Sequence, residues 1–226
     1  MKDLSKIDTT ISLGNLEIHQ PVTALTALVI AILCIYFYFT LKNMSNLNKS
    51  SNYWMLFFLF LGIATVLGAC SHAFYLVPEG WGYKSFWLTA QLFDGFCIYA
   101  AQQATLYSAL RFSKKTTVCK ISYNAQLLLF NISVFVFQNF IVAVIGFAVG
   151  LIPVMILHFK SGKNQTPDLW IAYGILISFL TAFVHLFKIG VHIYFNHLDV
   201  AHVFAMVNIS VMYVGIKQKA KASILS

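Results

Sequence analysis

Long apolar segments recur along almost the whole chain and constrain its fold more than any other feature of the sequence. Hydrophobic residues make up 59% of the 226 residues and charged residues only 10%, so a soluble domain would have to expose a largely apolar surface. A helix needs about 20 apolar residues to cross roughly 30 Å of hydrocarbon. The sequence therefore predicts an integral, multi-pass membrane protein.

The apolar segments predict an all-α fold, a bundle of seven transmembrane helices. The stretch 122–159 is too long for one helix, so it divides near Gln138 and Asn139, two adjacent polar amides. We see no internal repeat, low-complexity tract or second domain, so residues 1–226 are expected to form a single domain. The expected spans are 22–41, 54–76, 86–110, 122–138, 141–159, 168–187 and 199–216.

The basic residues indicate how these helices are oriented. When the loops are assigned alternately to the two sides, eleven of the 15 basic residues fall on the side of the C-terminus. Because cytoplasmic loops are enriched in lysine and arginine, the N-terminus is predicted outside and the C-terminus in the cytoplasm. The net charge of +8 then reflects topology and anionic head groups, and nucleic acid binding need not be invoked. The eleven are Lys42, Lys49, Arg111, Lys114, Lys115, Lys120, Lys160, Lys163, Lys217, Lys219 and Lys221, and the other four are Lys2, Lys6, Lys84 and Lys188.

Titratable residues from three predicted helices converge near the outer face of the membrane. His72 lies close to the outer end of the second helix, and His202 lies in the first turns of the seventh. Asp94 lies about 12 Å below the outer end of the third helix. A carboxylate at a helix centre costs on the order of 2.5–3.5 kcal/mol, so such groups face a cavity or one another. Asp94 therefore requires a metal, a protonated histidine or a proton of its own.

Imidazoles and a carboxylate that converge in a protected site are ligands that Zn²⁺ accepts. Three protein ligands leave a fourth position for water, and zinc lowers the pKa of that water to about 7. This combination predicts a hydroxide nucleophile, with Asp94 as a ligand or as the base that orients the water. His197 and Asp199, at the start of the seventh helix, are further candidate metal ligands.

The simpler interpretation of the same residues is structural. A single histidine at a helix end, such as His72, suits the membrane interface because its ring is apolar and its nitrogens are polar. His158 and His192 are expected to be loop or interfacial residues on those grounds. Asp199 can equally be a first-turn residue favoured by the helix macrodipole, with Asn196 as the N-cap.

Three parts of the sequence resemble a known superfamily. Gly68–His72 (GACSH) ends the second predicted helix, Asp94 lies in the third, and Phe195–His202 (FNHLDVAH) leads into the seventh. Together they resemble the CREST-like superfamily of seven-helix membrane proteins, which includes alkaline ceramidases and adiponectin/progestin receptors. The last segment is also similar to the F-N-x-N-D-x-x-H pattern of a group of uncharacterised membrane proteins.

The resemblance implies a zinc-dependent membrane hydrolase that cleaves an amide or ester bond of a lipid. In that superfamily, a helix-two histidine and two helix-seven histidines hold zinc, while a helix-three aspartate and a helix-two serine surround the water. Carried over, His72 and His202 are the expected zinc ligands and Asp94 is the expected partner of the water. A membrane lipid is the expected partner molecule, as substrate, and no protein partner is indicated.

Two departures from the superfamily pattern affect this site. Leu198 stands where the superfamily has the first histidine of its helix-seven pair, and Gly68 stands where it has the serine. The third ligand is therefore His197 or Asp199, or the site holds no metal.

Two other classes of function stay open. A proton-coupled transporter or channel would use the buried aspartate and histidines as a relay, and would need a polar path to the cytoplasm. A non-catalytic receptor or scaffold would only pair Asp94 with a histidine. A retinal photoreceptor is disfavoured because the interior of helix seven has no lysine for a Schiff base. The polar candidates for a relay path are Gln102, Gln103, Ser108, Asn208 and Ser210.

Overall fold

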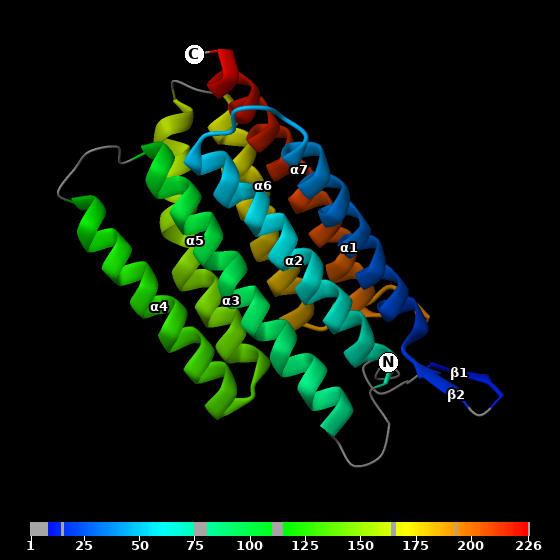
Figure 1. Ribbon diagram of the computed structural model, residues 1–226. Helices are drawn as coiled ribbons and strands as arrows, with labels where there is room; N and C mark the ends of the chain where they lie inside the picture. The colour runs from blue at the N-terminus through cyan, green and yellow to red at the C-terminus, as the bar shows by residue number, and fades with distance from the viewer. Residues whose placement is uncertain are drawn as a thin grey trace.

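Seven long helices follow a short antiparallel hairpin in chain order (Figure 1). The structure is a computed structural model that describes residues 9–14, 16–74, 81–109, 115–163, 166–192 and 194–225. The strands are β1 (Thr10–Leu13) and β2 (Leu16–His19), and the helices are α1 (Pro21–Lys42), α2 (Lys49–Ala73), α3 (Trp81–Ala109), α4 (Lys115–Phe137), α5 (Phe140–Gly162), α6 (Thr166–Leu186) and α7 (His197–Leu225).

The predicted seven helices are confirmed, and several are longer than their apolar segments. α2 begins at Lys49 because the Asn48 side chain caps it, accepting a hydrogen bond from the Ser51 backbone N–H at 2.8 Å. α7 continues to Leu225, beyond the predicted end at 216. The predicted ends at 76 and 110, like four of the basic residues used for topology, lie outside the described residues. Those four are Lys2, Lys6, Arg111 and Lys114.

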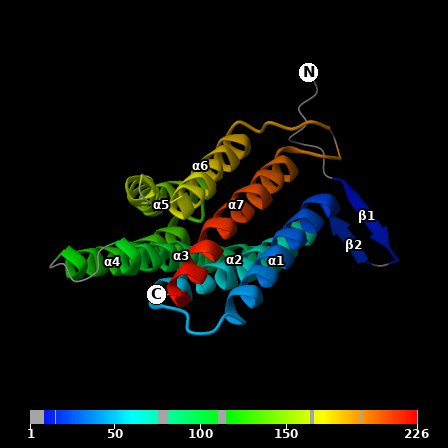
Figure 2. The ribbon, with the colours of Figure 1, turned by 90° about the horizontal axis from the view of Figure 1, so that it is seen from above.

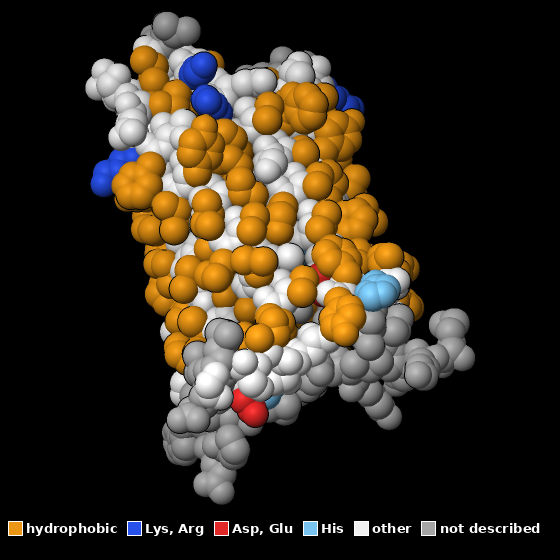
Figure 3. Space-filling view, turned by 90° about the vertical axis from the view of Figure 1, so that its right-hand side faces the viewer, with side chains coloured by type: hydrophobic (Ala, Val, Ile, Leu, Met, Phe, Trp, Pro, Cys, Tyr) orange, Lys and Arg blue, Asp and Glu red, His pale blue; other side chains and the backbone are white. Residues whose placement is uncertain are grey.

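The helices are suited to a membrane. Among the described residues, six helices are long and apolar enough to cross one, which is consistent with a multi-pass membrane protein. The helix outside that set, α3, carries polar residues along its length. Apolar side chains cover the side of the bundle in a space-filling view (Figure 3). The polar residues of α3 include Gln91, Asp94, Gln102 and Gln103.

The division between α4 and α5 falls where the polar amides predict it. Gln138 adopts a left-handed conformation with φ of 48°, which ends α4. Asn139 then caps α5, because its side chain accepts a hydrogen bond from the Ile141 backbone N–H at 2.8 Å. Two antiparallel helices therefore replace one long apolar stretch.

A hairpin that the sequence analysis does not predict precedes α1. Its register pairs Ile11 with Ile18 and Thr10 with His19, and Gly14 turns the chain with φ of 64°. Thr10 Oγ1 lies 2.9 Å from His19 Nδ1. The hairpin leads directly into Gln20, which precedes α1 and contributes to the site below.

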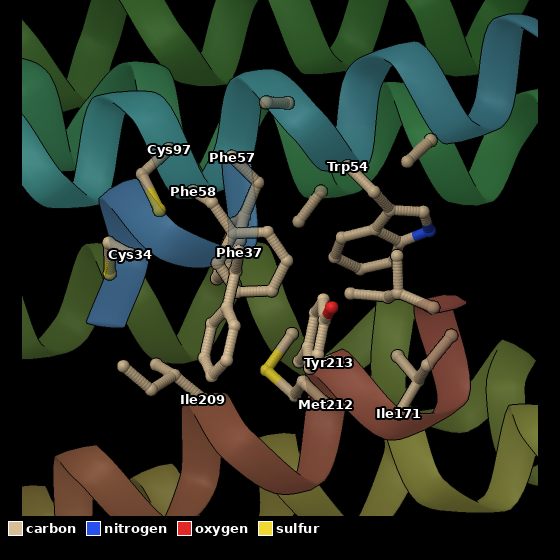
Figure 4. Packing of buried hydrophobic residues seen from close by; sticks show 14 of the residues in the cluster. Cys34, Phe37, Trp54, Phe57, Phe58, Cys97, Ile171, Ile209, Met212 and Tyr213 are labelled. Atoms are coloured by element: carbon tan, nitrogen blue, oxygen red, sulfur yellow. The ribbon is translucent and has the colours of Figure 1, made fainter. Parts of the chain in front are cut away.

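The helices pack around a core that fills one end of the bundle. Phe37 of α1 stacks on Tyr213 of α7 with ring centroids 4.0 Å apart, and meets the edge of Phe58 of α2 (Figure 4). These residues lie in the second half of α1, the first half of α2 and the middle of α7. α4 lies at the edge of the bundle, where it packs on α3 and α5 (Figures 1 and 2). The opposite end of the bundle, where α2 and α6 end, holds the site.

The contact between α6 and α7 depends on a glycine. A Cβ at Gly174 would lie 2.2 Å from Met212 Cγ and 2.8 Å from the Asn208 carbonyl oxygen. Gly174→Ala is therefore expected to separate the helices and destabilise the protein by roughly 1–3 kcal/mol. Thermal unfolding in detergent measures this loss of stability. Gly68→Ala is the control, because an added Cβ there has nothing within 4 Å. Equal unfolding temperatures for the two variants would contradict this account.

Candidate functional site

A cavity of about 560 Å³ lies between six of the helices, and α4 does not contribute to it. Most of its wall is apolar and aromatic, with Phe57, Phe147 and Phe179 among the larger side chains. Its polar lining includes the predicted His72 of α2, Asp94 of α3 and His202 of α7. The other polar lining residues are Gln20, Thr65, Tyr83, Gln91, Cys97, Ser178, Thr181, His185 and Asn208.

The three residues predicted to converge thus share one cavity. His72 and His202 are close, with ring centroids 6.0 Å apart in an edge-to-face arrangement. Asp94 is the carboxylate among the residues that line the cavity, and none of those residues is a lysine or an arginine. Its carboxylate therefore shares the cavity with imidazoles rather than with a fixed positive charge.

Neighbouring polar groups orient the rings of His72 and His202. His72 Nδ1 lies 2.8 Å from Gln20 Oε1, an acceptor, so Nδ1–H donates to it. His202 Nδ1 lies 2.8 Å from Thr26 Oγ1, and the Thr26 hydroxyl itself donates to the Thr23 carbonyl. Thr26 Oγ1 is thus the acceptor for His202 Nδ1–H. In both rings Nε2 is the nitrogen left to bind a ligand or accept a proton.

Gln20 holds an unusual backbone conformation at the edge of this cavity. Its φ of 45° and ψ of 51° are left-handed, which is uncommon for a residue other than glycine. Its backbone N–H donates to the Thr9 carbonyl at 3.0 Å, and its side chain reaches His72. The hairpin thereby fixes the residue that orients the His72 ring.

Two further polar atoms in the cavity wall have no hydrogen-bond partner within the part of the chain that the structure describes. They are Gln91 Oε1 on α3, one turn from Asp94, and Thr181 Oγ1 on α6, one turn from His185. Buried polar atoms in proteins almost always have a partner. A bound molecule with hydrogen-bonding groups, or water, would satisfy both.

Asp199 and His197, the other candidate ligands, do not line the cavity. Asp199 is fully buried, and its carboxylate oxygens accept hydrogen bonds from Thr23 Oγ1 at 2.8 Å and the Asn196 backbone N–H at 2.7 Å. The Asn196 side chain in turn accepts from the Leu198 backbone N–H at 2.7 Å. This reciprocal arrangement is a capping box, which favours the structural interpretation of Asp199.

His185 is a cavity residue that the sequence analysis does not identify. It lies in the last turn of α6, and its ring packs on Phe140 at 3.9 Å and on His197 at 5.4 Å between centroids. Its depth along the helix could have identified it. α6 and α2 both end at this side of the bundle, so His185 lies at about the depth of His72 (Figure 1).

The polar side chains of the cavity are of the types that bind zinc. Two imidazoles with oriented rings, a third imidazole and a carboxylate are ligands that zinc takes. Within the described residues, however, no three histidine, cysteine, aspartate or glutamate side chains form a group that could hold a metal ion. Binding a metal therefore requires a side chain of the cavity to turn.

A second buried polar cluster lies at the opposite end of the bundle. His158 Nδ1 of α5 and Lys219 Nζ of α7 each lie 2.5 Å from Asp168 Oδ1 of α6, and Thr105 Oγ1 of α3 lies 3.1 Å from His158 Nε2. The expectation that His158 is interfacial is wrong, because its exposed fraction is only 1%. Its aspartate partner explains the burial.

Comparison with known proteins places this chain in a family. Residues 22–221 match the family described as "Family of unknown function (DUF6962)", so the chain belongs to that family. No curated protein and no solved structure matches the chain.

Proposed function

We propose that this member of the DUF6962 family is a zinc-dependent membrane hydrolase that cleaves an amide or ester bond of a lipid. The observation that carries the proposal is the cavity, which gathers His72, Asp94 and His202 from three helices in a mostly apolar wall. Its volume of about 560 Å³ lies within the range of roughly 300–1,000 Å³ usual for ligand pockets.

Each polar residue has a defined role in this proposal. His72 and His202 would hold the metal through Nε2, the nitrogen left available because Gln20 and Thr26 orient their rings. Zinc, when bound, would act as a Lewis acid and make water a stronger nucleophile at neutral pH. Asp94 accepts the proton of the attacking water and returns it to the leaving group.

The lining also bears on the substrate. Aromatic and aliphatic side chains suit an acyl chain, whose burial contributes about 0.8 kcal/mol per CH₂ group. No lysine or arginine is found among the lining residues, so a lipid without a phosphate at the scissile end fits better than an anionic one. Gln91 and Thr181 offer hydrogen bonds to its polar groups.

We place the N-terminus outside and the C-terminus in the cytoplasm, with all seven helices crossing the membrane. The basic side chains seen in Figure 3 lie in the upper half of the molecule, and the histidine and acidic side chains in the lower half. The upper half contains the end of α7 and the α1–α2 connection, which carry Lys42, Lys49 and Lys217. Under the positive-inside rule, the cavity then lies toward the outer leaflet.

The transport interpretation receives less support. Of the five polar residues predicted for a relay path, only Asn208 lines the cavity. Gln102 instead donates to Gln126 Oε1 and the Gly150 carbonyl, holding α3 against α4 and α5. The Ser108 and Ser210 hydroxyls donate to carbonyls of their own helices.

Metal analysis of the detergent-purified protein tests the proposal. About one zinc per chain is expected in the wild type after zinc supplementation, with loss of most of it in His202→Ala, because that variant removes a ligand. Asp199→Asn is the control, since Asp199 caps α7 and does not line the cavity. Absence of zinc from the wild type would overturn the proposed function.

A further inference from the structure

We infer that His185 of α6 supplies the third imidazole of the zinc site, an inference that rests on the proposed function. His185 lines the same cavity as His72 and His202. The rings of His72 and His202 are already close, with centroids 6.0 Å apart. Neutral imidazoles that share one cavity are the form that ligates zinc.

The position of His185 relative to α7 supports the assignment. α6 and α7 pack closely along their length, and His185 and His202 both lie near the side where α6 ends and α7 begins. Leu198, one turn before His202, also lines the cavity but has no donor atom. An imidazole from α6 can therefore replace the one that α7 lacks.

The alternative donors are less suitable. The Asp199 carboxylate already accepts hydrogen bonds from Thr23 and Asn196, and His197, whose ring packs on that of His185, does not line the cavity. Asp94 lines the cavity, but three imidazoles complete the protein ligands of a tetrahedral catalytic zinc and leave the fourth position for water. Asp94 then remains free to act as the base.

One side chain has to move for this site to form. The His185 ring now packs on Phe140, with centroids 3.9 Å apart, and the described residues hold no three-donor group. Because His185 also borders the cavity, the proposed site requires its ring to turn from Phe140 toward His72 and His202.

X-ray absorption spectroscopy of the zinc-loaded full chain in detergent tests the inference. Three imidazoles are expected around zinc in the wild type, and His185→Ala is expected to weaken zinc binding at least tenfold. His197→Ala is the matched control, because the neighbouring ring does not line the cavity, and it should leave both results unchanged. If His185→Ala keeps the wild-type number of imidazoles around zinc and the wild-type zinc affinity, the assignment of His185 is overturned but the proposed function stands.

Two more variants separate ligation from a structural effect. Adding Leu198→His to His185→Ala is expected to restore tight zinc binding, since it places an imidazole one turn before His202. His185→Cys loaded with Co²⁺ is expected to show a sulfur-to-cobalt charge-transfer absorption that the wild type lacks. A folded His185→Cys protein that binds Co²⁺ without that absorption would exclude residue 185 from the metal. Wild-type protein that binds no zinc would overturn the proposed function and this inference together.

Discussion

Asp168→Ala is expected to lower the free energy of unfolding by about 3–5 kcal/mol, because it leaves the buried His158 and the mostly buried Lys219 without their acceptor. Thermal unfolding in detergent, followed by circular dichroism, measures the loss. Asp168→Asn keeps the size of the side chain, so its free energy of unfolding should fall by less. Lys221→Ala is the control, since this exposed lysine of the same helix α7 should change stability by no more than about 0.5 kcal/mol.

The size of this effect follows from how many helices the cluster joins. Asp168 Oδ1 accepts hydrogen bonds from both α5 and α7, and Thr105 connects the cluster to α3. The cluster lies at the end of the bundle opposite the cavity, so the folded fraction of Asp168→Ala should bind zinc as the wild type does. An unfolding temperature equal to that of Lys221→Ala would show that the cluster contributes little.

The helices could be predicted because the thickness of a membrane sets the length of an apolar segment, which is a property of the sequence alone. Even the α4–α5 division follows from local chemistry, since Asn139 is a good N-cap. The hairpin could not be predicted in that way. Two strands of four residues have little stability by themselves and depend on packing, here of β2 against α2.

The convergence of His72, Asp94 and His202 could be predicted because depth along a helix follows from counting residues. His185 lies at a similar depth, but depth does not say which way a helix face points, and that rotation is set by packing between helices. The His158–Asp168 pair was missed for another reason. Both residues lie near helix ends, where titratable groups suit the membrane interface, and only the fold brings Lys219 to them.

Asp94→Asn is expected to lower the rate of lipid hydrolysis by about 10²–10⁴-fold, the usual contribution of a general base, while zinc stays bound. The amide is nearly the same size as the carboxylate but cannot accept the proton of the attacking water. Because Asp94 is the carboxylate among the described residues that line the cavity, none of those residues offers a second acid to replace it. Release of fluorescent fatty acid from N-acyl and O-acyl lipids in mixed micelles measures the rate.

Measuring zinc in the same samples distinguishes a base from a ligand. If three imidazoles hold the metal, Asp94→Asn should keep about one zinc per chain, whereas His202→Ala should lose both metal and activity. Asp199→Asn should keep both, because Asp199 caps α7 and does not line the cavity. Loss of zinc from Asp94→Asn would indicate that Asp94 is a metal ligand. An unchanged rate of hydrolysis in Asp94→Asn would show that Asp94 is not the base.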